Sequence, residues 1–164
     1  MRMTVASEYS CLALLAIAEA SEGWCKTHDI TERFTIPAPF LQQILRKLTG
    51  AGFLVSRRGA DGGFKLAMDA SEISIADVVR AVDGPLAPVR SASKNFYQPT
   101  PLEASPAFSA LMREVRDVVA ELLEAKTLAD MVAEEGRAAR ARHRVEVRAE
   151  RQRREKLEKR RVKS

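Results

Sequence analysis

Two short helical patterns, a tight turn between them and a glycine-rich hairpin lie within residues 27–67 and constrain the fold more than any other part of the chain. The first helix is predicted from Thr27, a suitable N-cap residue, to Phe34. The second is predicted from Pro39, because proline is tolerated in a first helical turn, to near Gly50. Its apolar residues recur at helical spacing: Phe40, Leu41, Ile44, Leu45 and Leu48.

The flanking segments complete a recognisable order of elements. Residues 53–55 and 64–67 are β-prone, and three glycines between them supply the backbone freedom for a hairpin. Residues 4–20 form a predicted helix that is apolar on all sides and must be buried on two of them. Helix, short helix, turn, helix and hairpin are the order of a winged helix-turn-helix, whose second short helix enters the major groove of DNA.

The second half of the chain is predicted to be helical around a central loop. Ser74 caps a helix to Val82, and residues 86–104, which contain several prolines, form a loop. Ser105 opens the longest periodic helix, and Thr127 caps a last short turn. An apolar stripe of the long helix is typical of a core or a dimer interface, with the wall of an effector pocket as the alternative. It comprises Phe108, Leu111, Met112, Val115, Val118, Val119 and Leu122.

Charge is distributed unevenly along the chain. The net charge of +5 combines a body of net −2 over residues 1–132 with a tail of net +7 over residues 133–164. Within the body, residues 33–65 hold six basic residues against the single acid Asp61. The tail has too few large aliphatic residues to build a core and is expected to be flexible or partly helical. It either adds phosphate contacts or is a solvated extension.

The basic segment contains side chains suited to both grooves of DNA. Gln42 and Gln43 point away from the apolar face of their helix, and glutamine forms two hydrogen bonds with adenine. Arg46 and Lys47 follow one turn later, in positions suited to phosphates. At the hairpin, Arg57 and Arg58 stand beside flexible glycines, where a guanidinium can enter a narrow minor groove.

Several motifs resemble those of the Rrf2 family of bacterial transcription regulators, which includes the IscR, NsrR and CymR types. They are Ser7-Glu8-Tyr9, Ile36 to Ile44, Arg58 to Phe64, and Ile75 to Pro85, and the resemblance covers residues 1–132. It implies a homodimer crossed through a helix over residues 105–125 that binds a pseudo-palindromic operator. Pro39 stands where many members have a hydroxyl residue, so one hydrogen bond of the family is missing here.

The resemblance also implies the residues that contact DNA. Phe40 and Gln43 match family positions in the major groove, and Arg58 matches the wing arginine of the minor groove. Together with the charges described above, the expected DNA-contacting set is Arg2, Phe40, Gln42, Gln43, Arg46, Lys47, Arg57, Arg58 and Gly59.

The sequence departs from the cluster-binding members of the family. Those members carry three cysteines before the long helix, whereas residues 83–104 contain neither cysteine nor histidine, so no iron–sulfur cluster is expected. His28 and His143 lack the spacing of a zinc site. Cys25, beside Trp24, is expected to fill a small apolar core position, and a redox-active thiol near Lys26 and His28 is the alternative.

The sequence predicts a mainly α fold with a small β-hairpin wing, in the form of a winged helix-turn-helix with a long dimerisation helix. The expected regions are a DNA-binding domain at 1–84, a sensor-type loop without cysteine at 85–104, a dimerisation helix with a closing turn at 105–132, and the basic tail at 133–164.

The expected function is sequence-specific binding of double-stranded DNA by a homodimeric repressor. No nucleophile or phosphate-binding motif of an enzyme occurs. The longest uncharged apolar run, residues 11–18, is too short to span a bilayer, so no membrane partner is expected and the chain is placed in the cytoplasm. The alternative is a protein-interaction or RNA-associated module that uses the long helix and the tail. The sequence names neither a protein partner nor a small effector.

Overall fold

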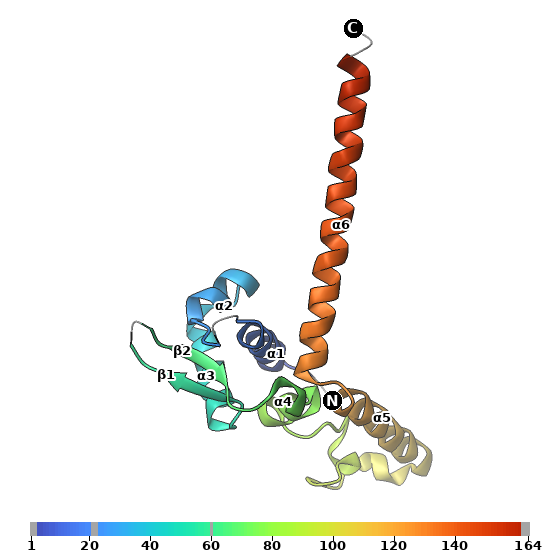
Figure 1. The fold of residues 1–164 in the computed structure, drawn as a ribbon. Coiled ribbons are helices and arrows are strands. Elements are labelled where there is room, and N and C mark those ends of the chain that lie inside the picture. The colour runs from blue at the N-terminus through green and yellow to red at the C-terminus, as the bar shows by residue number, and fades with distance from the viewer. Residues whose placement is uncertain (1–2, 21–22, 60, 162–164) are drawn as a thin grey trace. The chain divides into compact units, whose positions relative to one another are not determined.

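The computed structural model describes residues 3–20, 23–59 and 61–161, and the chain divides into two units, Met1–Met131 and Val132–Ser164. Its helices and strands follow one another as shown in Figure 1: α1 (Val5–Ala18), α2 (Thr27–Phe34), α3 (Ala38–Gly50), β1 (Leu54–Arg57), β2 (Gly63–Leu66), α4 (Ile75–Asp83), α5 (Pro106–Glu124) and α6 (Leu128–Arg161). Short 3₁₀ turns lie at Ala70–Glu72, Arg90–Ala92 and Pro101–Ala104.

Helix α1 occupies the centre of the first unit, as its apolar residues predict. It contacts α2, α3, α4 and β2, and its Leu14 side chain is fully buried. The apolar face of α3 contributes the fully buried residues Leu41, Leu45 and Leu48 to the same core. Burying a leucine side chain stabilises a fold by about 1.5–3 kcal/mol, so this shared core fixes α3 against α1.

Side-chain caps fix the helix starts in the first unit. The hydroxyl of Ser74 accepts a hydrogen bond from the backbone N–H of Asp77, at 3.1 Å, and that of Thr127 accepts one from Asp130, at 3.2 Å, which confirms both predicted caps. The prediction that Thr27 caps α2 was wrong. Thr27 is the first helical residue, because the carboxylate of Asp29 accepts the backbone N–H of Lys26 at 3.0 Å and so sets the cap one residue earlier.

The hairpin is a two-stranded antiparallel sheet in which Leu54 pairs with Leu66 and Arg57 with Gly63. Its return strand is attached to the segment before α2, because the backbones of Cys25 and Phe64 exchange two hydrogen bonds of 2.9 Å. A Cβ atom at Gly63 would lie 2.7 Å from the carbonyl oxygen of Cys25. Only glycine therefore permits this close approach of the two backbones.

A carboxylate at the end of α4 holds the start of α1. Asp83 accepts hydrogen bonds from the backbone N–H of Thr4, at 2.8 Å, and from its hydroxyl, at 2.5 Å. Thr4 is the N-cap of α1, so the negative charge also lies at the positive end of that helix. Burial acts to raise the pKa of Asp83, but the hydrogen bonds from Thr4 and the charge of Lys47 outweigh it and lower this pKa.

Helix α6 corrects the expectation of a last short turn at Thr127. The helix is continuous over 34 residues, because alanine, arginine, glutamate and lysine dominate the segment and all favour helices. Its first residue, Leu128, is buried in the first unit and donates its backbone N–H to the carbonyl of Ile73 at 2.8 Å. No helix among the described residues is long and apolar enough to cross a membrane.

We expect Asp83→Asn to lower the free energy of unfolding at pH 7 by about 1–3 kcal/mol, because hydrogen bonds to a charged acceptor are lost. Since the pKa of Asp83 is lowered in the folded state, its contribution is present above about pH 4 and is lost as the pH falls through the lower folded pKa. Urea unfolding at pH 7 and pH 3 measures both effects. The exposed Glu114→Gln is the control, and an equal loss in both variants, or a loss that persists unchanged at pH 3, contradicts the assignment.

Candidate nucleic-acid interface

Helix α3 presents a polar face to solvent because its apolar residues are drawn into the core. Gln42, Gln43 and Arg46 are all exposed, and none of them hydrogen-bonds another described residue. Leu41 and Leu45, on the opposite face, are fully buried. The amide groups of the two glutamines are therefore available to pair with the hydrogen-bonding edge of a base in a groove.

Phe40, at the start of α3, is half-buried. Its ring meets the Tyr9 ring edge to face, with centroids 5.6 Å apart and an interplanar angle of 72°. Such aromatic pairs contribute about 0.5–1.5 kcal/mol beyond the area that they bury. Phe40 thus connects the start of α3 to α1, and its expected contact in the major groove stays a prediction.

Lys47, at the other end of α3, has a partner within the protein. Its Nζ donates to the carbonyl oxygen of Val82 at 2.6 Å and so satisfies a free carbonyl at the end of α4. A cation at the C-terminus of a helix is also favoured by the helix dipole. Any phosphate contact by Lys47 competes with this bond.

The two arginines at the end of β1 lie in different environments. The guanidinium of Arg57 stacks over the Trp24 ring, 4.5 Å from its centroid, and its Nε donates to the carbonyl oxygen of Asp61 at 3.0 Å. Arg58 is exposed and has no hydrogen-bond or ion-pair partner among the described residues. Gly59 beside it has a φ of 105°, a backbone conformation that favours glycine. Arg57 therefore braces the hairpin, while Arg58 is free to reach a ligand.

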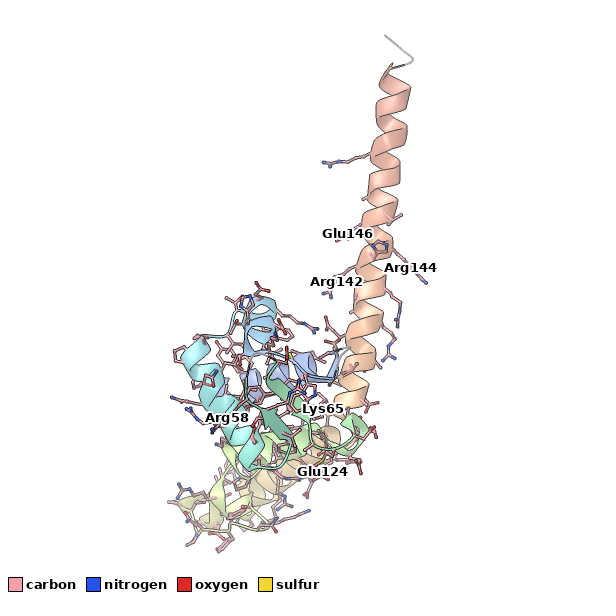
Figure 2. All side chains as sticks on the ribbon, turned by 60° about the vertical axis from the view of Figure 1, so that its left-hand side comes forward. Arg58, Lys65, Glu124, Arg142, Arg144 and Glu146 are labelled. Atoms are coloured by element: carbon pink, nitrogen blue, oxygen red, sulfur yellow. The ribbon has the colours of Figure 1, made fainter. Side chains whose placement is uncertain are left out.

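The structure divides the six basic residues of 33–65 into two groups. Arg33 pairs with Glu19 and stacks on Phe34, and Lys47 and Arg57 have the partners given above. Arg46, Arg58 and Lys65 are exposed and have no hydrogen-bond or ion-pair partner in the part of the chain that the structure describes; Figure 2 labels Arg58 and Lys65. The positive charge open to a polyanion thus lies on α3 and the hairpin. Arg2 lies outside the described residues.

Sequence reasoning missed Trp24 as the residue that holds the hairpin arginine. Trp24 precedes α2 and is far from Arg57 along the chain, and no periodicity connects the two. The exchange of hydrogen bonds between Cys25 and Phe64 brings this segment to the hairpin. The only sequence signal for this backbone pairing is Gly63, and a glycine at that position is also expected simply from the turn of the hairpin.

The apolar stripe of α5 lies outside the core of the described chain. Five of its members are exposed by between 37% and 61%: Phe108, Leu111, Val115, Val118 and Leu122. The other two, Met112 and Val119, are partly buried. A different face of α5, with Ala120 and Leu123, packs on a small core of Ala76, Val79 and Leu86. The stripe is therefore an apolar surface rather than an internal packing face.

The loop before α5 is held by an arginine of that helix. Arg116 donates to the carbonyl oxygen of Ala92 at 2.6 Å and pairs with Asp117, which also meets Lys94 at 3.2 Å. Hydrogen bonds from Arg116 and Lys94 lower the pKa of Asp117 to about 2. Loop and helix together border a hollow of about 610 Å³, whose lining includes Leu86 and Ala120.

The residues of this loop do not fit an iron–sulfur cluster. Such clusters need several thiolate ligands, and residues 83–104 contain no cysteine. Cys11 belongs to α1, where burial and the charge of Asp83 raise the pKa of its thiol to about 11. The described residues hold no group of three or more cysteine, histidine or carboxylate side chains that would bind a metal ion.

Cys25 occupies a small apolar position in the core. It is 4% exposed, and burial, followed by the charge of Asp29, raises the pKa of its thiol, so the reactive thiolate is disfavoured. His28, which the sequence places near it, pairs instead with Glu32 at 3.1 Å. The structure thus favours the packing interpretation of Cys25 over the redox one.

The chain is similar to known transcriptional regulators. Residues 3–134 match the profile of the Rrf2 family, which is described as an iron-dependent transcriptional regulator. Rv1287 of Mycobacterium tuberculosis, classed with the HTH-type transcriptional regulators, is 38% identical over 135 residues, which cover 80% of this chain and 81% of that protein. The HTH-type transcriptional regulator CymR of Bacillus subtilis is 27% identical over 132 residues, covering 80% and 89%.

Solved structures of CymR and IscR have a similar fold. The structure of CymR, the global cysteine regulator of B. subtilis, superposes with a TM-score of 0.70 at 25% identity and covers 82% of this chain and 98% of that one. IscR of T. potens has a TM-score of 0.67 at 24% identity, covering 84% and 90%, which shows the shared fold. The predicted fold, a mainly α winged helix-turn-helix with a hairpin wing, is confirmed.

Proposed function

Since this chain belongs to the Rrf2 family of DNA-binding transcriptional regulators, we propose that it recognises one DNA sequence with α3 and the hairpin and represses transcription as a homodimer. The observation that carries this proposal is the pair of unpartnered glutamines on α3, which packs against β1, the strand that leads to Arg58. Gln42 and Gln43 read base edges in the major groove, and Arg58 enters the adjacent minor groove. Arg46 and Lys65 bind phosphates.

The homodimer forms through the apolar stripe of α5. Contiguous exposed apolar residues on a helix mark an interaction surface, because their burial removes apolar area from water. A two-fold axis along this stripe makes the interface self-complementary. Two winged domains related by such an axis read two half-sites of a pseudo-palindromic operator.

Regulation in this proposal is by occupancy, without a catalysed reaction. A dimer bound at a promoter excludes the transcription machinery from the same DNA. No iron–sulfur cluster is assigned to the loop over residues 83–104, because that loop lacks thiol and imidazole ligands. The iron dependence in the family description is therefore not carried over to this chain.

Gln43→Ala is expected to weaken binding to a preferred duplex by about 1–3 kcal/mol, because two hydrogen bonds to a base are lost. Arg58→Ala is expected to flatten the preference for a narrow minor groove. Fluorescence anisotropy with the preferred duplex and a scrambled one measures the selectivity. Arg113 is exposed on α5, and Arg113→Ala removes the same charge as Arg58→Ala. This control variant should retain the selectivity of the wild type. Unchanged selectivity in both site variants, or retained binding to RNA alone, contradicts the proposal.

Val118→Asp is expected to convert the dimer to a monomer, because the substitution places a charge in the apolar stripe. Sedimentation equilibrium measures the mass, and circular dichroism checks that the helices remain. Ala110→Asp introduces the same charge at another exposed position of α5, outside the stripe, and should leave the dimer intact. A Val118→Asp protein that remains dimeric, or a monomeric wild type, contradicts the assigned interface.

A further inference from the structure

Helix α6 extends well beyond the residues that the family shares. The family match ends at residue 134, whereas α6 continues to Arg161. A helix of 34 residues is about 51 Å long, since each residue adds about 1.5 Å. Most of this helix, from residue 132 onward, belongs to the second unit of the chain and offers a long, regular surface outside the winged domain and the α5 stripe.

One face of α6 gathers arginine without an intervening acid. Arg137, Arg140 and Arg144 are separated by three and four residues, so they lie on the same side of the helix. The sequence continues this spacing with arginine at positions 148 and 151. We call the three described residues the arginine face. Figure 2 shows Arg144 projecting to one side of α6, with Arg142 and Glu146 on the other.

Two members of the arginine face are free of internal partners. Arg137 pairs with Glu134 at 3.7 Å, a long and exposed contact that contributes little. Arg140 and Arg144 are exposed and form no hydrogen bond or ion pair with any other described residue. On the other side of the helix, Arg142 pairs with Glu135 at 3.1 Å. Arg140 and Arg144 thus keep their full charge toward solvent, whereas Arg142 on the other side is paired with an acid.

We propose that the arginine face is a second DNA-binding surface that contacts the phosphate backbone without reading bases. Arginine suits phosphate because its planar guanidinium donates two parallel hydrogen bonds, and a row of cations along a rigid helix complements a row of phosphates. The proposal rests on the proposed function only for the choice of duplex DNA as the polyanion. A duplex bound by the winged domain has a raised effective concentration for a helix of the same chain.

A lipid surface fits this helix less well. Amphipathic helices that bind membranes carry large apolar side chains such as Trp, Phe and Leu opposite their basic face. From residue 132 to residue 147, the apolar residues of α6 are alanine and valine. Helix α6 therefore has the charge to bind a polyanion in solution but lacks the apolar side chains that would anchor it in a bilayer.

The test compares two double variants of the full-length chain with the same change in charge. Arg140→Gln/Arg144→Gln removes the two free members of the arginine face, and Arg142→Gln/Arg153→Gln removes two exposed arginines elsewhere on α6. Glutamine favours helices about as well as arginine, so α6 is preserved. Binding to a mixed-sequence DNA duplex of several helical turns is measured over a series of salt concentrations.

Each lost phosphate contact lowers the slope of log affinity against log salt by about 0.9, so the first variant should lose about 1.8 and the control little. Equal losses in both variants, no loss in either, or a loss seen only with single-stranded RNA would overturn the assignment. Base selectivity is read separately with the preferred and scrambled duplexes. If the protein is selective but the salt slope of the arginine-face variant is unchanged, the arginine-face proposal alone is rejected. If that slope falls but the protein shows no base selectivity, the winged-domain proposal alone is rejected.

Discussion

The burial of α1 is the constraint on which the first unit depends. Because this helix is apolar on more than one side along most of its length, other elements must pack on it, and α2, α3, α4 and β2 do so. The same packing buries one face of α3 and so forces Gln42 and Gln43 outward. Asp83 then fixes the start of α1 to the end of α4. The exposed polar face of α3 is thus a consequence of how the core is filled.

Electrostatics in the interface separates structural charges from available ones. Arg57 is held by Trp24 and Lys47 by the end of α4, and these contacts position the hairpin and α3. Their neighbours Arg58 and Arg46 remain exposed. A residue that braces an element cannot bind a ligand through the same donors without giving up that contact. The exposed side chains without internal partners therefore define the surface to which we assign the proposed base reading and phosphate binding.

The sequence was sufficient for the order of elements but not for contacts between distant segments. Periodicity predicted α1, α3 and α5, and hydroxyl residues predicted the caps at Ser74 and Thr127. The Trp24–Arg57 contact escaped because it depends on backbone pairing before α2. The length of α6 exceeds the prediction because few large aliphatic residues rule out a core but not a helix, and helix propensity alone sustains an exposed helix rich in arginine and alanine.

In the proposed function, two copies of α3 and the hairpin read DNA together. Selection of duplexes from a random-sequence pool by the full-length protein tests it most directly, because the pool contains every possible half-site and favours none of them. We predict enrichment of one inverted repeat, with half-site centres about 10 base pairs, or a multiple of that distance, apart. Enrichment of a single unrepeated site, or no enriched sequence, would rule out paired reading by a dimer.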